Sequence, residues 1–235
     1  MSYTKRTDGR KFDELRPMEA KVGVVKNAKG SAMFKIGKTI AIAAVYGPRD
    51  LYPAHLQDPT RAIIRCNYNM MAFSGSGDRV RPGPSRRSKE ISMITEKSLT
   101  PMVDLKAFPG GVVDVFVELV QTDAGTRCAG ITAAALALAD AGIPMLDMVS
   151  AVAVGRIGDK VVLDVDKEEE DYPDGMADIP LAIANRTGKI TLLQADGEFT
   201  KEDLKKGIEL GKKGCAKILE VQLKALKEKY EGAKK

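Results

Sequence analysis

The segment from residue 122 to 144, TDAGTRCAGITAAALALADAGIP, constrains the fold of this chain more than any other part of it. Its run of alanine and other small apolar residues predicts a helix from Thr126 to Ala141, which a glycine ends and which packs closely against a sheet. Gly125, Thr126 and Arg127 stand at its start, where unpaired backbone N–H groups attract anions. The same residues are also typical of an ordinary helix cap. The segment therefore predicts either a phosphate-sized site or a cap without a ligand.

Strand and helix patterns alternate along the rest of the chain. A Gly, Pro and Ser-rich stretch at 73–85 predicts a mobile loop, and Ser85 is placed to cap the helix that follows it. Thr200 and Asp203 open a last helix, whose tail we expect to be solvated and frayed. We expect strands at 18–27, 31–37, 38–47, 62–71 and 112–120, hairpins at 148–165 and 177–196, and a buried stripe of Leu204, Ile208, Cys215, Ile218, Leu219 and Leu226 in the last helix. This alternation predicts one α/β or α+β unit with helices laid on sheet faces.

Composition restricts the class of protein. With 235 residues, 44% of them hydrophobic, the chain is large enough for a continuous core. Its apolar runs fall short of the roughly 18 residues that a membrane span needs, and its N-terminus lacks the apolar region of a secretory signal. We therefore expect a soluble, cytoplasmic protein with no membrane partner. We expect one domain over residues 1–235, with an arm over about 1–17, a core over about 18–199 and a C-terminal helix over about 200–230.

Three cysteines, Cys66, Cys128 and Cys215, accompany a single histidine, His55. This odd number without CxxC or Cys/His spacing argues against a disulfide framework and against a zinc site. Cys128 at a helix start has the position of a reactive thiol, but no histidine stands near it in sequence. We interpret it as a small packing residue.

Charge is separated along the chain. Between Arg61 and Lys97 there are eight basic residues and three acidic ones, an excess equal to the net charge of +5 of the whole chain. Between Asp164 and Asp178 there are eight acidic residues, and only Lys167 opposes them. The chain thus presents a basic segment and an acidic segment.

The acidic segment contains the second candidate site. Asp171 and Asp178 flank a turn that contains Pro and Gly, so their carboxylates are able to converge. Crowded carboxylates repel, which raises the pKa of one of them or recruits a divalent cation. The pair therefore suits a general acid or a magnesium ligand, and the alternative is a solvated acidic loop.

The basic segment suits a polyanion. Arg86 and Arg87 stand at a predicted helix start, where a cationic side chain opposes the helix dipole and gains nothing locally. Arg65 lies on a predicted strand, and Arg61 precedes it. Aromatic residues are sparse here, so the backbone of a nucleic acid would be the main contact.

Four motifs in this order carry a resemblance to a known family. The chain resembles the RNase PH family of phosphorolytic exoribonucleases, and within it the catalytic type of subunit in archaeal exosome rings. The resemblance covers the chain from about Arg6 to the last helix. It implies an α+β fold with a duplicated β-α-β-α core of the type seen in domain 2 of ribosomal protein S5. The motifs are RTDGRKFDELRP, RPGPSRRSKEISMITEKSL, VVDVFVELVQTDAGTRCAGITAAALALADAGIPM and VVLDVDKEEEDYPDGMADIPLAI.

The resemblance also implies roles for individual residues. Inorganic phosphate, the second substrate, would be bound by Gly125, Thr126, Arg127, Cys128 and Arg87. RNA would be bound by Arg61, Arg65, Arg86 and Arg87. Asp171, Asp178 and Arg127 would be catalytic, with Asp178 and Asp171 holding Mg²⁺. Because the turn here is one residue longer than in the family, Asp174 competes with Asp171 for the role of general acid.

The activity implied is phosphorolysis of RNA 3′ ends, which releases nucleoside diphosphates and is reversible as 3′ tailing. The partners implied are a homologous inactive subunit in an alternating hexameric ring and RNA-binding cap subunits with S1 or KH-type domains. Two alternatives stay open. One is a non-catalytic RNA-binding ring subunit, which the presence of Arg127 with the Asp171/Asp178 pair disfavours. The other is a small-molecule kinase, although the chain contains no GxxxxGK[ST] motif.

Overall fold

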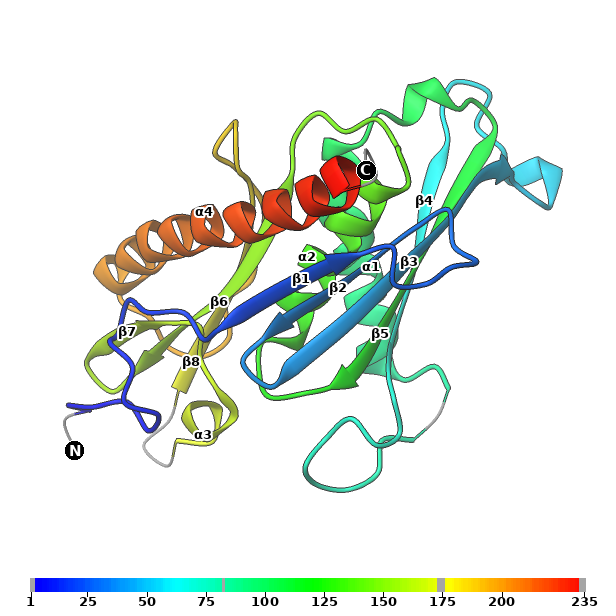
Figure 1. Ribbon diagram of the computed structural model, residues 1–235. Helices are drawn as coiled ribbons and strands as arrows, with labels where there is room; N and C mark the ends of the chain where they lie inside the picture. Colours follow the sequence, from blue (N-terminus) through cyan, green and yellow to red (C-terminus); the bar gives the residue numbers. More distant parts are fainter. Residues whose placement is uncertain (1–2, 82, 173–175, 233–235) are drawn as a thin grey trace.

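Two β-sheets share one apolar core in this computed structural model, which describes residues 3–81, 83–172 and 176–232 (Figure 1). In this part of the chain a five-stranded sheet has the order β1-β2-β3-β5-β4, and a four-stranded sheet has the order β7-β6-β8-β9. Only β4 and β5 pair in parallel. The strands are β1 Met18–Val22, β2 Gly30–Ile36, β3 Thr39–Asp50, β4 Ile63–Met70, β5 Gly111–Gln121, β6 Val149–Ile157, β7 Lys160–Leu163, β8 Met176–Ala184 and β9 Lys189–Leu193.

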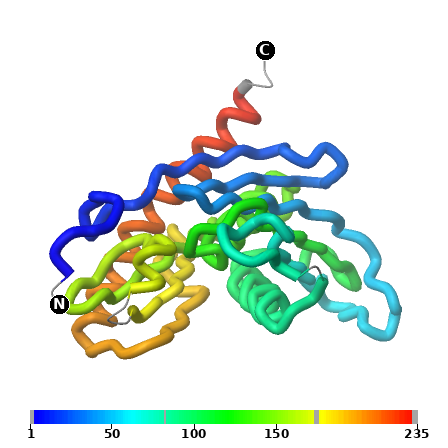
Figure 2. Tube along the Cα trace, turned by 90° about the horizontal axis from the view of Figure 1, so that it is seen from below, coloured from blue at the N-terminus to red at the C-terminus, as the bar shows by residue number. Residues whose placement is uncertain are grey.

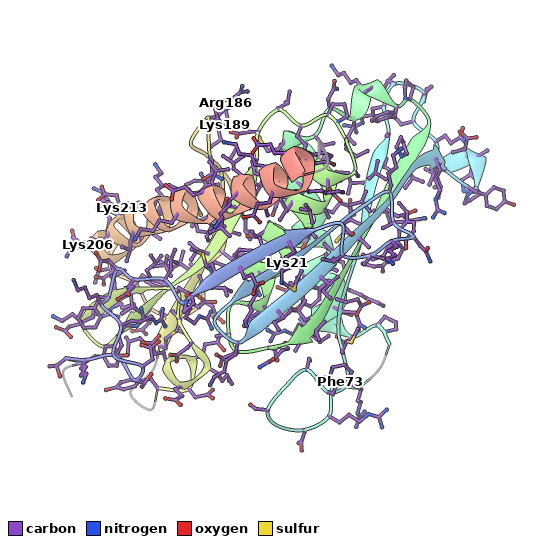
Figure 3. All side chains as sticks on the ribbon, viewed as in Figure 1. Lys21, Phe73, Arg186, Lys189, Lys206 and Lys213 are labelled. Carbon is purple, nitrogen blue, oxygen red and sulfur yellow. The ribbon has the colours of Figure 1, made fainter. Side chains whose placement is uncertain are left out.

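The helices pack on both faces of the four-stranded sheet: Ala153 of β6 faces the start of α2, and the adjacent Val154 faces α4. Helix α2 packs against strands of both sheets, α1 packs against β4, and α4 crosses from β6 and β7 to β1, as Figures 1 and 2 show. The bounds are α1 Arg86–Leu99, α2 Thr126–Asp140, α3 Lys167–Glu170 and α4 Lys201–Gly232, with short 3₁₀ turns η1 Ala54–Leu56, η2 Thr100–Met102 and η3 Leu105–Ala107. The α+β fold expected from the sequence is confirmed, and so are the helix beginning at Thr126, the Ser85 cap of α1 and both hairpins.

Helix α2 is the centre of the molecule. Thirteen of its residues are buried, so small side chains are needed on almost every side of it. Gly130 shows how tight this packing is, because a Cβ there would lie 3.2 Å from Val117 Cγ1 and 3.5 Å from the ring of Tyr68. The alanine-rich sequence is thus the condition for placing one helix between two sheets.

Helix α4 differs from the expectation in its buried face. Cys215 and Ile218 are buried as expected, but the rest of the closest face consists of glycine and other small or polar residues. Gly214 allows Leu163 to approach, since a Cβ there would lie 2.9 Å from Leu163 Cδ1. The expected Leu204, Ile208, Leu219 and Leu226 are only half-buried. The spacing of apolar residues predicts the helix, but it does not predict the glycines that let the helix approach the sheet.

The tail of α4 is solvated as expected, since residues 227–231 are exposed, but it is not frayed over its described part, because it stays helical to Gly232 and two of its side chains contact α2. Lys229 Nζ lies 2.5 Å from Asp140 Oδ1, and the Tyr230 hydroxyl donates to the backbone oxygen of Asp140 at 3.1 Å. Asp140 is at the C-terminus of α2 and also accepts from the Ser31 backbone N–H at 3.0 Å. The two helices are therefore tied together at this end.

The cysteines have the packing role expected of them. Cys66, Cys128 and Cys215 are unpaired and buried, and burial raises the pKa of the Cys66 and Cys215 thiols to about 12. Burial also raises the pKa of the Cys128 thiol. The three thiols thus lack the lowered pKa that a reactive thiol needs. Among the described residues there is also no helix that is long and apolar enough to cross a membrane.

Candidate functional site

The turn between β5 and α2 presents backbone N–H groups to the solvent side of the core. Ala124 and Gly125 both have left-handed backbone conformations, with φ of 58° and 62°. The buried Thr39 hydroxyl accepts from the Asp123 N–H at 2.9 Å and donates to the Ala124 oxygen at 2.8 Å. The Ala124 carbonyl therefore points away, and no side chain of the described residues caps the start of α2. The free amides and the helix dipole suit an anion here.

A cavity of about 440 Å³ opens in front of this turn. Its walls come from four parts of the chain: the end of β4, the loop before α1, the start of α2, and the acidic segment with β8. Figure 1 shows this loop and α3 on the same, lower side of the sheets. The sequence-predicted residues in its wall are Arg87, Gly125, Thr126, Arg127, Cys128 and Asp178, joined by Tyr68, Arg81, Ser85, Ser88, Lys167 and Glu170 among others.

Arg127 lies in the cavity wall and makes only weak charge interactions with the described residues around it. Its Nη1 donates to Gln194 Oε1 at 2.6 Å, and its Nη2 lies 3.8 Å from Glu90 Oε1. Its Nε is buried and has no hydrogen-bond partner within the described residues. A neutral amide and a distant carboxylate leave most of the guanidinium charge uncompensated. Arg127 is thus available to a ligand anion.

Asp178 is a carboxylic acid whose pKa is raised to near neutrality. Burial, and after it the carboxylate of Glu170, raises the pKa of Asp178 to about 7, against the lowering effect of Arg127. Its Oδ1 is buried and makes no hydrogen bond to the described residues. Register on β8 holds the residue, since Asp178 pairs with Gly155 of β6 and its backbone bonds both ways with Asp196. A carboxyl that titrates near neutrality suits proton transfer.

Glu170 is a functional candidate that the sequence did not single out. It ends α3, lines the cavity, and burial raises its pKa while Lys167 and Arg87 lower it. Lys167 lies in the same wall, with Nζ 3.9 Å from Glu170 Oε2. The acidic run offered no signal to distinguish Glu170 from its neighbours. The capping Asp166, whose carboxylate accepts from the Glu169 N–H at 3.0 Å, is the feature that predicts this short helix.

Asp171 lies away from the cavity. Its side chain is 64% exposed and its Oδ1 lies 2.7 Å from Lys167 Nζ, and it is absent from the cavity wall. The geometry therefore brings Asp178 together with Glu170 rather than with Asp171. The competing Asp174 lies outside the described residues. The catalytic and metal-binding roles of Asp171 stay predictions.

The predicted RNA contacts divide into two groups. Arg87 lines the cavity, and Arg86 is exposed beside it at the start of α1. Arg65 lies farther along β4, where its Nε donates to the fully buried Asp114 at 2.6 Å. Arg61 is exposed and paired with Asp58 at 3.0 Å. Arg65 and Arg61 are thus outside the cavity, on surface that a longer ligand would have to cross.

Tyr68 is the other residue that sequence reasoning missed. Its ring is buried, and its hydroxyl has no hydrogen-bond partner among the described residues although it faces the cavity. Burial raises its pKa, and the side chain of Thr126 and then the charges of Arg87 and Arg127 oppose this rise. A buried hydroxyl without a well-formed hydrogen bond costs free energy unless a ligand or water completes it. Tyr68 therefore adds a polar group to the anion site.

A magnesium ion fits the donor set only in part. No group of three or more His, Cys, Asp and Glu side chains surrounds a metal position among the described residues. Two carboxylates, Glu170 and Asp178, do share the cavity wall, and Asp178 has an unpaired oxygen. Magnesium is commonly bound by one or two carboxylates together with substrate phosphates and waters. The residues present suit that mode and not an all-protein cage.

Comparison with known families gives two adjacent matches. The first domain of the 3′ exoribonuclease family, RNase PH, matches residues 14–144, and its second domain matches residues 147–214. The exosome complex component Rrp41 of Methanopyrus kandleri is 52% identical over 227 residues, covering 97% of this chain and 94% of that protein. The same component of Pyrococcus abyssi is 54% identical over 226 residues, covering 96% and 90%.

Solved structures agree with the fold. Rice (Oryza sativa) Rrp46 superposes with a TM-score of 0.81 at 27% identity, covering 92% of this chain and 98% of that one. A chain of the Archaeoglobus fulgidus exosome with RNA bound to the active site superposes with a TM-score of 0.77, covering 92% of each chain. At 24% identity the second likeness shows the fold alone.

Proposed function

Because the chain belongs to the RNase PH family of 3′ exoribonucleases, we propose that it is the catalytic, phosphate-dependent subunit of an exosome ring. It shortens RNA from the 3′ end by phosphorolysis and releases nucleoside diphosphates. The observation that carries this proposal is one cavity that joins the amides of α2, Arg127 and an acid with a pKa near neutrality. Phosphorolysis needs all three, because an anion attacks an anionic linkage and the leaving oxygen needs a proton.

Inorganic phosphate is bound at the start of α2, by the amides of Thr126, Arg127 and Cys128 and by the Arg127 guanidinium. Arg87 completes this site from α1. One phosphate oxygen attacks the phosphorus of the last phosphodiester, and the bond from that phosphorus to the 3′ oxygen of the preceding nucleotide breaks. The cationic side chains offset the repulsion between the two phosphates, which is the main obstacle to the reaction.

The leaving 3′ oxygen takes its proton from a carboxylic acid of the cavity wall. Asp178 is the best placed, because it is buried, unpaired at Oδ1 and protonated in part at pH 7. Glu170 supports it by disfavouring its ionised form. Asp171, the acid expected from the family motif, takes this role only if the segment rearranges when substrate binds.

Magnesium, if held by Glu170 or Asp171 together with the substrate phosphates, would supply positive charge that helps to offset the two phosphates. Asp178 would hold the ion only in its ionised form, after its proton has left. The protein side chains do the rest of the positioning. RNA approaches past Arg65 and Arg61 toward Arg86 and Arg87, all of which bind its backbone. This path uses phosphate contacts and therefore reads no sequence.

The assembly proposed is a hexameric ring in which an inactive homologous subunit alternates with this chain. Cap subunits with S1 or KH-type domains bring RNA to the ring. The relatives named as exosome complex components support membership of such a complex. The cytoplasmic location expected from the sequence stays a prediction.

The test is to incubate the chain, with and without its homologous partner subunit, with 5′-labelled RNA, magnesium and phosphate. We expect nucleoside diphosphates, and polymer growth when diphosphates are supplied instead. Monophosphates released without phosphate would mean hydrolysis and contradict the proposal. RNA binding without any product would indicate a non-catalytic ring subunit, and ATP binding in a calorimeter without RNA decay would indicate a small-molecule kinase.

A further inference from the structure

We propose that Arg16, in the N-terminal arm, is a positioning residue that fixes the anion-binding turn relative to the acidic segment. This inference rests on the proposed function, because it concerns how the two halves of the proposed site, the anion-binding turn and the acidic segment, keep their relative positions. Neither half contains Arg16, and its side chain does not line the cavity.

The guanidinium of Arg16 is buried, with 5% of the side chain exposed. Its Nε and its backbone N–H both donate to Asp164 Oδ2, at 3.0 and 2.8 Å, and its Nη2 donates to Asp164 Oδ1 at 2.7 Å. Asp164 is itself buried and has a left-handed φ of 57°. Arg16 thus makes the short contacts to both carboxylate oxygens at the point where the chain leaves β7, while Arg10 is farther from Oδ2, at 3.4 Å, and Arg6 binds the Asp164 backbone oxygen at 2.8 Å.

The remaining nitrogen of the same guanidinium reaches the other half of the site. Arg16 Nη1 donates to the Asp123 backbone oxygen at 2.5 Å and lies 3.5 Å from Asp123 Oδ2. Asp123 is the first residue of the turn whose next two residues, Ala124 and Gly125, have positive φ. Arg16 Nη2 also lies against the turn, 3.5 Å from where a Gly125 Cβ would be. Arg16, together with the Thr39 hydroxyl, therefore holds the turn from which the α2 amides extend.

Asp164 transmits this anchor to the catalytic wall. Its N–H donates to the oxygen of Ala153, a cavity residue, at 2.8 Å. Two residues later Asp166 caps α3, which carries Lys167 and Glu170 into the cavity. A shift of Asp164 would move these groups relative to the bound phosphate. Displacements of about 1 Å are enough to reduce rates by about 100-fold.

The arrangement requires the fork of an arginine. A guanidinium offers five N–H donors in a plane and here joins a carboxylate to a carbonyl on opposite sides. An ammonium keeps the charge but cannot span both groups in the same geometry. Arg16→Lys should therefore preserve the buried ion pair with Asp164 and lose the connection to Asp123.

The test compares wild type, Arg16→Lys and Arg16→Met, each assembled as the full chain with its partner subunit. We expect Arg16→Lys to lower kcat/KM for phosphate by roughly 10 to 100-fold while KM for RNA stays within about twofold. Inorganic phosphate affinity, measured by calorimetry without RNA, should fall in the same variant. Lys229→Met is the matched control, because Lys229 also pairs with a buried carboxylate, Asp140, but remote from the cavity. It should leave both constants unchanged.

The outcomes distinguish failure of the proposed function from failure of the positioning role of Arg16. A wild type that neither binds phosphate nor makes diphosphates would overturn the proposed function. A wild type that does both, with Arg16→Lys equal to it, would overturn the positioning role alone, as would equal losses in Lys229→Met. If Arg16→Met does not fold, Gly37→Ala replaces it, since a Cβ there would lie 2.5 Å from Arg16 Cδ and displace the side chain without removing its charge. An unchanged phosphate affinity in folded Gly37→Ala would also count against the proposal.

Discussion

Asp178→Asn should stabilise the ligand-free protein while it removes activity. The carboxyl of Asp178 ionises in the folded chain with a pKa of about 7 instead of 3.8. That rise corresponds to roughly 4 kcal/mol at about 1.36 kcal/mol per pH unit. Because water can partly solvate the group, we expect about 1–3 kcal/mol to be realised, or a Tm increase of roughly 2–10 °C for a chain of this size.

The size of this stabilisation depends on pH. A raised carboxyl pKa means that the folded state holds the proton more tightly than the unfolded state between about pH 4 and pH 7. Wild-type stability therefore falls through this window as pH rises, and the loss is complete above it. Asparagine does not ionise. The gain of Asp178→Asn should thus be near zero at pH 4 and largest at pH 8.

The assay is thermal unfolding of both proteins in EDTA, from pH 4 to pH 8. Asp171→Asn is the matched control, because Asp171 is exposed and pairs with Lys167; it should show no gain that grows with pH. A Tm difference for Asp178→Asn that is absent at pH 8, or equal at pH 4 and pH 8, would refute the reasoning. Added magnesium without phosphate should reduce the difference, since a cation pairs with the carboxylate of the wild type.

Three further predictions concern activity and packing. Arg127→Glu should abolish phosphate-dependent decay in the labelled-RNA assay while the ring stays intact by size-exclusion chromatography; undiminished turnover would rule out the phosphate site at α2. Glu170→Gln should shift the alkaline limb of the pH–rate profile for kcat to lower pH, because the proposed acid Asp178 then loses its proton at a lower pH; loss of catalysis in Asp171→Ala with normal RNA binding would instead restore Asp171 as the acid. Gly211→Val should cost about 2 kcal/mol or more and lower the Tm by roughly 4–8 °C in a thermal melt, because a Cβ there collides with Leu181; an unchanged Tm would mean that α4 is not tightly packed.

Local sequence patterns predicted helices and their ends well where these depend only on neighbouring residues. The alanine run specified α2, and the Ser85 cap specified the start of α1, because capping and helix propensity act over neighbouring residues. The glycine face of α4 was missed, since a hydrophobic pattern looks for large apolar side chains. Gly214 contributes by letting Leu163 approach, and nothing in the local sequence reports that distance.

The candidate site was predictable in its anion half and less so in its acidic half. Gly125, Thr126 and Arg127 are consecutive residues at one helix end, so their order in the sequence already places them beside one another in the structure. The carboxylates depend on which residues of α3 and β8 face inward. A run of four acids gives no period from which to choose between Glu170 and Asp171. The contacts of Arg16 could not be predicted from local sequence patterns, because its two partners are 107 and 148 residues away in the chain.

The charges of the cavity explain why an acid with a pKa near 7 belongs beside a phosphate site. Among the described residues of the wall, Arg81, Arg87, Arg127 and Lys167 oppose Glu170 and Asp178, so the cavity attracts an anion. A phosphate bound at α2 adds negative charge beside Asp178, and a like charge favours the protonated form of a carboxyl. In the proposed mechanism, substrate binding therefore favours the protonated form of Asp178 until the 3′ oxygen begins to carry charge. The attacking anion would thus also keep the acid in the form that donates a proton.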